Sequence, residues 1–151
     1  MKFKGDIIIT DPCYIIRKDR EFKFDPNKEE RDDDWAKCNF GDNMEALGIN
    51  HYLTESTIWG DWSCTTYKTG TKKVLGHFCA DAGLVSVFLL EEVLKYNPDF
   101  DYHIKRPHTT TWIKNFDGDV EIKNIDDDGD HIQVVVIGKG NINFFTRQTG
   151  L

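Results

Sequence analysis

Residues 109–146 read TTTWIKNFDGDVEIKNIDDDGDHIQVVVIGKGNINFFT, and this stretch contains the clearest signals of the fold class. β-branched and aromatic residues, which favour extended backbone, fill short runs, and Asp, Asn and Gly, which favour turns, separate them. The pattern predicts strands at 109–116, 119–123, 131–137 and 141–146, with turns at 117–118, 126–130 and 138–140. Because consecutive strands with such short connections pair antiparallel, the C-terminal third is predicted to form a meander.

The preceding sequence carries the same signals with longer gaps between them. Further strands are predicted at 6–10, 52–58, 63–68, 73–80 and 84–88, with an extended course at 13–16. One main helix is predicted at 89–96, since Glu91 and Glu92 suit its first turn and Asn97-Pro98 ends it. The chain is therefore expected to be mainly β, with α+β as the alternative class, and to form an antiparallel barrel or sandwich.

Length and composition predict one β-rich domain spanning residues 1–151. With 39% hydrophobic residues, a chain of this size can close a core without disulfides or a structural metal. The four cysteines form no C-x-x-C pair, so no metal site and no cofactor are predicted. Reduced thiols and the absence of an apolar leader favour a cytoplasmic location.

Charge restricts the class of partner. The chain has 19 basic and 26 acidic residues, a net charge of −7, which is the opposite of the basic surface that holds a phosphate backbone. No direct contact with nucleic acid is therefore expected. The same charge disfavours anionic membrane surfaces, and no apolar run approaches the ~20 residues that span a bilayer. A small molecule or another protein is the expected partner, and the sequence leaves the oligomeric state open.

Three predicted strand ends each combine an aspartate with a cysteine. If these ends converge, they would form a cleft lined by carboxylates and thiols, with an imidazole nearby. The alternative is that the aspartates accept backbone hydrogen bonds in turns while the cysteines fill the core. The candidate binding residues are Asp11, Cys13, Asp61, Trp62 and Asp81, and the candidate catalytic residues are Cys79, His77 and Cys64.

These residues leave three function classes open. The first is a binding module with its cleft at the Asp11, Asp61 and Asp81 turns. The second is a hydrolase with Cys79 or Cys64 as nucleophile and His77 as base, which would require a thiol of depressed pKa. The third is a structural or assembly protein, which would present an extended apolar surface. Whether the chain is an enzyme is not decided by any motif.

Three short elements resemble a family of small uncharacterised proteins from bacteria and their phages. They are Asp11-Pro12-Cys13-Tyr14, the stretch GDWSC at 60–64, and the stretch FCADAGLVSVF at 78–88. The resemblance spans about residues 5 to 90. It implies a compact, β-rich cytoplasmic protein, of phage or bacterial origin, and carries over no catalytic residue.

Overall fold

The computed structural model describes residues 1–16, 47–57, 63–80, 83–100, 109–125 and 134–149. Within these ranges the chain is mainly β, as predicted, with one α-helix, α2 (Leu90–Tyr96), and two 3-10 turns, η1 (Pro12–Ile15) and η4 (Pro98–Phe100). The strands are β1 (Lys2–Thr10), β2 (Tyr52–Ser56), β3 (Ser63–Lys68), β4 (Val74–Cys79), β5 (Leu84–Leu89), β6 (Thr110–Lys123), β7 (Val135–Gly140) and β8 (Phe144–Gln148). No helix among the described residues has the length and apolar character needed to cross a membrane.

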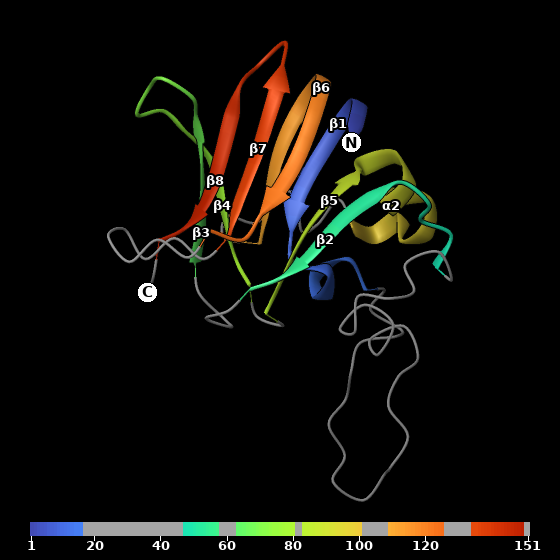
Figure 1. Cartoon of the computed structure of the whole chain (residues 1–151). Coiled ribbons are helices and arrows are strands. Elements are labelled where there is room, and N and C mark those ends of the chain that lie inside the picture. The colour runs from blue at the N-terminus through green and yellow to red at the C-terminus, as the bar shows by residue number, and fades with distance from the viewer. Residues whose placement is uncertain (17–46, 58–62, 81–82, 101–108, 126–133, 150–151) are drawn as a thin grey trace, which may run out of the picture.

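All eight strands belong to one antiparallel sheet in the order β2-β5-β1-β6-β7-β8-β3-β4. Strands β6, β7 and β8 form an antiparallel meander as predicted, but with three strands in place of the predicted four. Helix α2 lies beside β1 and β5, whereas β3 and β4 lie at the other end of the sheet (Figure 1). The sheet curls so far that β4 contacts β6. A Cβ on Gly76 of β4 would lie only 2.9 Å from Oγ1 of Thr111 on β6. In the described part of the chain the edge strands β2 and β4 do not pair, so the curled sheet stays open.

The second half of β1, residues 7–10, is buried on both faces. Ile7 and Ile9 point into the interior of the curled sheet, and Ile8 points to the opposite face, which α2 covers. This arrangement explains the unbroken Ile7-Ile8-Ile9 run, since a strand covered on both sides needs no polar alternation. The layer under α2 is apolar and consists of Ile8, Ile15, Ile16, Ile49, Phe88, Leu90, Val93 and Phe100.

The segment after β1 differs from the prediction of an extended course at 13–16. Pro12–Ile15 forms the 3-10 turn η1, and the Asp11 side chain caps it by accepting a hydrogen bond from the backbone N–H of Cys13. Pro12 at the first position favours the turn because its φ is already fixed near the helical value. A capping carboxylate followed by proline therefore outweighs the extended preference of the residues that follow.

The hairpin predicted at Asp117-Gly118 is wrong. The chain continues through it as one strand, β6, in which Gly118 pairs with Phe3 on one side and with Gly140 on the other. A Cβ on Gly118 would lie 2.2 Å from the carbonyl oxygen of Lys139. Glycine is therefore present because the neighbouring backbones approach closely, and not because the chain reverses.

The turn predicted at 138–140 is also wrong, since these residues belong to β7. Gly138 lies opposite Phe144, whose ring fills the space a side chain would occupy, 2.0 Å from an ideal Cβ. The reversal follows at 141–143, where the side chain of Asn141 accepts from the backbone N–H of Asp117 and that of Asn143 from Gly140. Strand β8 consequently begins and ends later than predicted.

Strand β1 begins four residues earlier than predicted, at Lys2, and the other remaining elements agree closely with the prediction. Strand β3 has the predicted bounds, β2 and β4 are slightly shorter, and α2 begins at Leu90 because Leu89 still pairs with Ile7. The predicted turn at 126–130 and the beginning of the strand predicted at 131–137 lie outside the described residues.

Candidate functional site

One end of the curled sheet gathers the termini of several strands. Strands β1 and β8 end there, and β3 and β5 begin there (Figure 1). Side chains alternate between the two faces of a strand, and residues directly opposite each other in a ladder share a face. Cys64 lies opposite Gln148, and Thr66 lies opposite Thr146, so these four side chains share the inner face. With Asp11 and Thr111 they form a group that we call the polar end: Asp11, Cys64, Thr66, Thr111, Thr146 and Gln148.

Three threonine hydroxyls of the polar end are joined by hydrogen bonds across the interior. The Oγ1 atoms of Thr66 and Thr146 are 2.7 Å apart, and Thr66 donates to Oγ1 of Thr111 at 3.4 Å. All three residues are buried. The bond to Thr111 joins β3 to β6 across the curled sheet, so these hydroxyls fix how the sheet folds over itself.

Asp11 is fully buried immediately after β1. One carboxylate oxygen accepts from the backbone N–H of Cys13 at 3.0 Å, and the other accepts from that of Leu84, at the beginning of β5, at 3.3 Å. The carboxylate therefore ties three segments together: the end of β1, the turn η1 and the beginning of β5. A buried charge needs such hydrogen bonds to offset the loss of hydration.

Cys64 lies close enough to Asp11 to be affected by its charge. Burial, followed by the nearby Cys79 and Asp11, raises the pKa of the Cys64 thiol from 9.0 to about 12. The thiol is thus protonated at neutral pH. Since nucleophilic cysteines need the thiolate, this environment gives Cys64 the character of a buried core thiol.

Of the polar end, the sequence analysis identified Asp11 and Cys64 but neither the three threonines nor Gln148. Gln148 is 2% exposed, and in the described part of the chain neither Nε2 nor Oε1 of its carboxamide has a hydrogen-bond partner. The carboxamide can donate twice and accept twice, so among the described buried residues it has the largest unused hydrogen-bonding capacity. The sequence does contain a signal for Gln148. The alternate positions Phe144, Thr146 and Gln148 continue the period of a strand two residues beyond the predicted end at 146.

Of the other candidate residues, those that the structure describes do not share the inner face with Cys64. His77 and Cys79 lie opposite Thr65 and Ser63, on the outer face of β4, and the Cys79 sulfur is 3.8 Å from the Ser63 hydroxyl. A pairing of Cys64 with His77 would therefore have to cross the sheet. Cys13 packs against the layer under α2. Asp61, Trp62 and Asp81 lie outside the described residues.

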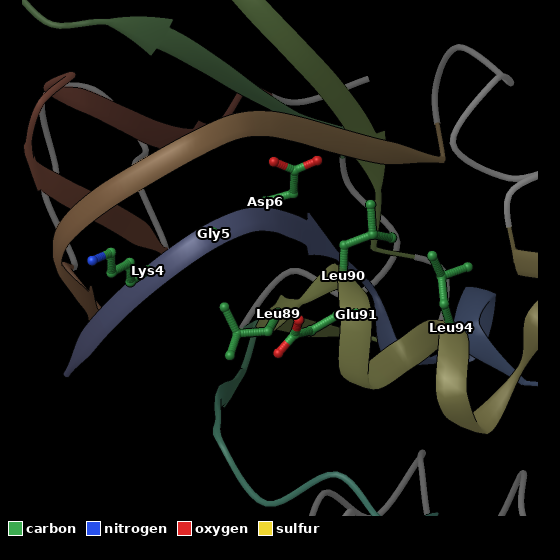
Figure 2. Close-up of a pocket in the computed structure, with 7 residues that line it drawn as sticks. All are labelled: Lys4, Gly5, Asp6, Leu89, Leu90, Glu91 and Leu94. Atoms are coloured by element: carbon green, nitrogen blue, oxygen red, sulfur yellow. The ribbon is translucent and has the colours of Figure 1, made fainter.

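A separate hollow of about 290 Å³ lies between β1 and the beginning of α2 (Figure 2). It forms where β1 bulges at Gly5, with Leu89, Leu90 and Leu94 along its side. Asp6 turns towards β6, where its carboxylate accepts from the indole N–H of Trp112 at 3.2 Å and from the backbone N–H of Asn115 at 2.9 Å.

The charges around this hollow do not select a ligand. With Asp6 engaged by β6, its charged rim consists of Lys4 and Glu91, which are both exposed and opposite in sign. Exposed charges are well hydrated and add little binding energy. We therefore assign the hollow to the geometry of the bulge and give it no ligand.

Comparison with protein-family models, curated proteins and solved structures found no match to this chain. The likeness to small bacterial and phage proteins stays an expectation from three short elements. Among the described residues, no group of three or more histidine, cysteine or acidic side chains is placed to hold a metal ion. Function must therefore be argued from the geometry of the polar end.

Proposed function

We propose that this protein is a binding module that holds a small neutral molecule at the polar end, by its contact with the carboxamide of Gln148. The observation that carries the proposal is that this carboxamide is buried and has no hydrogen-bond partner among the described residues. A buried amide without partners destabilises the folded protein by about 1–3 kcal/mol. A buried polar group without a partner needs an explanation, and a bound ligand that completes its hydrogen bonds provides one.

The surroundings of Gln148 restrict the chemistry of the ligand. The nearby carboxylate of Asp11 gives the polar end a negative charge, and both of its oxygens already accept backbone hydrogen bonds. An anionic ligand would be repelled. A ligand that offers an N–H and a carbonyl side by side would match the carboxamide with two parallel hydrogen bonds, as amides, ureas and pyrimidine bases do.

The hydrolase alternative has weaker support. It needs a thiolate and a base on one side of the sheet, whereas Cys64 is protonated at neutral pH and His77 lies on the opposite face. Cys79 and His77 share a face, and there the Cys79 sulfur lies 3.8 Å from the Ser63 hydroxyl. The cytoplasmic location is part of the proposal, since Cys13, Cys64 and Cys79 are not joined in disulfides.

The test uses the substitution Gln148→Met, which keeps the length of the side chain and removes its hydrogen-bonding groups. Nicotinamide, uracil and N-methylurea are each presented to the wild-type protein and to the variant, and binding is measured by saturation-transfer NMR. We expect at least one probe to bind the wild type and none to bind the variant. The free variant should be more stable in urea by about 1–2 kcal/mol, because a buried unpaired amide is removed.

The control is Thr65→Val, which lies on β3 beside the polar end but on the outer face. It should leave probe binding unchanged. If all three probes fail to bind, or if Gln148→Met binds them as the wild type does, the proposal is wrong. A variant that is less stable than the wild type would show that the carboxamide has partners in the folded protein.

A further inference from the structure

A second, chemically different surface lies on the outer face of β7 and β8. A groove of about 420 Å³ runs along it, within the size range of small-molecule sites. Its apolar side chains include Val135 and Ile137 of β7, Phe145 of β8, and Ile125, which is 39% exposed. We call this the outer groove. The period-2 alternation places Phe145 and Arg147 on the opposite face of β8 from Thr146 and Gln148.

The charges beside the outer groove are unevenly distributed. Asp119 and Glu121 of β6 lie on the same face, opposite Lys139 and Ile137, whereas the residues opposite Arg147 are uncharged. The charged side chains among the described residues that line it are Lys139 and Arg147, both cationic, in a protein of net charge −7. Cationic side chains beside an apolar surface favour a ligand that is apolar along most of its length and anionic at one end.

Arg147 provides the more specific of these two cations. Its guanidinium lies over the ring of Tyr67, with Cζ 5.7 Å from the ring centroid, and that ring stacks on Phe145 at 5.4 Å. The aromatic contacts hold the guanidinium in place. Its Nε is buried, and no hydrogen-bond partner for it is found in the described ranges. An arginine fixed in this way presents a planar donor pair suited to a carboxylate.

We propose that the outer groove binds an aliphatic carboxylate, with the carboxylate on Arg147 and the alkyl chain along Ile137 and Phe145. Lys139 adds charge at the rim. The carboxylate would accept a hydrogen bond from Nε of Arg147, and the alkyl chain would cover the exposed apolar side chains. The ligand class differs from that of the polar end, so this inference does not depend on the proposed function.

Decanoate, below its micellar concentration, is the probe, and its affinity is measured by isothermal titration. We expect saturable binding that weakens about fourfold for each methylene removed in the series to octanoate. Decanol should bind at least tenfold more weakly, because it lacks the charge. Arg147→Gln should lose at least tenfold in affinity. Amide shifts in NMR spectra should map the binding to Ile137 and Phe145.

Two further variants separate a loss of binding from a loss of folding. Lys139→Gln alters an exposed side chain, so the variant should fold normally. Its affinity for decanoate should be about two- to fivefold lower. Lys73→Gln, at an exposed position outside the groove, should bind decanoate as the wild type does. Gln148→Met should also bind decanoate normally, so failure at one site is distinguishable from failure at the other.

Several results would overturn the inference. Decanol and decanoate could bind equally, which would remove the role of the cations. Arg147→Gln could retain full affinity. Decanoate could also fail to bind. If sedimentation then shows a concentration-dependent dimer, and NMR amide shifts on dimerisation map to the outer groove, a second copy of the chain is the occupant.

Discussion

The two ends of the curled interior are built from different chemistry, and β8 runs from one to the other. At its beginning, Phe144 packs edge-on against Phe116 with ring centroids 5.4 Å apart. Two residues later Thr146 bonds to Thr66, and two residues after that Gln148 is buried with its carboxamide unpaired. The same strand thus passes from hydrophobic packing, through paired hydroxyls, to an unpaired amide.

The apolar end stabilises the fold, whereas the polar end can hold a ligand. Burial of an aromatic ring is favourable wherever the packing is dense. Buried polar groups at best offset their lost hydration, and they are destabilising when they lack partners. We infer that packing at the apolar end offsets the free energy that burial of polar groups costs at the polar end.

The largest expected effect is at the apolar end. Phe144→Ala should lower the free energy of unfolding by about 3–5 kcal/mol, because it opens a cavity against Phe116 and above Gly138. Urea unfolding monitored by circular dichroism measures the change. Phe145→Ala is the control, since this ring is half-buried on the outer face and its loss should cost clearly less. Equal losses of unfolding free energy for the two variants would show that the inner ring contributes no more to stability than the outer ring.

A smaller loss is expected where the polar end meets β1. Asp11→Ala leaves the backbone N–H groups of Cys13 and Leu84 without their acceptor, and should lower the free energy of unfolding by about 2–4 kcal/mol. Asp119→Ala removes an exposed carboxylate and should change stability by less than about 0.5 kcal/mol. Hydrogen exchange of the Leu84 amide should become faster in the Asp11 variant only. An unchanged stability would mean that the capping bonds are weak.

Cys64 makes the polar end sensitive to alkaline pH. Its pKa of about 12 in the folded protein is above the unfolded value of 9.0, so between these values the unfolded chain loses the proton that the folded chain retains. Stability from this thiol is fully present below pH 9 and falls by up to about 1.4 kcal/mol per pH unit as the pH rises towards 12.

The measurement compares wild type with Cys64→Ala in urea at pH 8, 9, 10 and 10.5. Other groups titrate in this range, so the informative quantity is the difference between the two proteins. That difference should shrink as the pH rises, because only the wild type loses the contribution of the thiol. Parallel pH profiles would contradict the raised pKa.

Much of the fold could be predicted because local signals and burial agree. The Ile7-Ile8-Ile9 run and the alternation of residues 63–68 indicate strands wherever their partners lie. Asp117-Gly118 misled because its turn signal is local, whereas its conformation is decided by β1 and β7 on either side. A close approach of two backbones requires glycine as strongly as a turn does, and one sequence does not distinguish them.

The candidate site was predictable only in part. An aspartate before proline at a strand end indicates a cap, which Asp11 provides. The alternation that sends Cys64 inward and His77 and Cys79 outward depends on pairing register, which spacing alone does not fix. Gln148 was missed because a glutamine near the C-terminal end of the sequence is usually exposed, and only the paired strand β3 reveals its burial.

The smallest expected effect tests whether the threonine hydroxyls act as a unit. Thr146→Val keeps the shape of the side chain and leaves the buried hydroxyl of Thr66 without its bond of 2.7 Å, so it should cost about 1 kcal/mol. Thr66→Val should cost slightly more, because it also removes the bond to Thr111. The double variant should cost less than the sum of the two, since it no longer leaves one hydroxyl of the pair unmatched. A double-mutant cycle in urea measures the coupling. Strict additivity would show that the hydroxyls are independent, and the polar end would then be a set of separate buried groups without a shared network to order it.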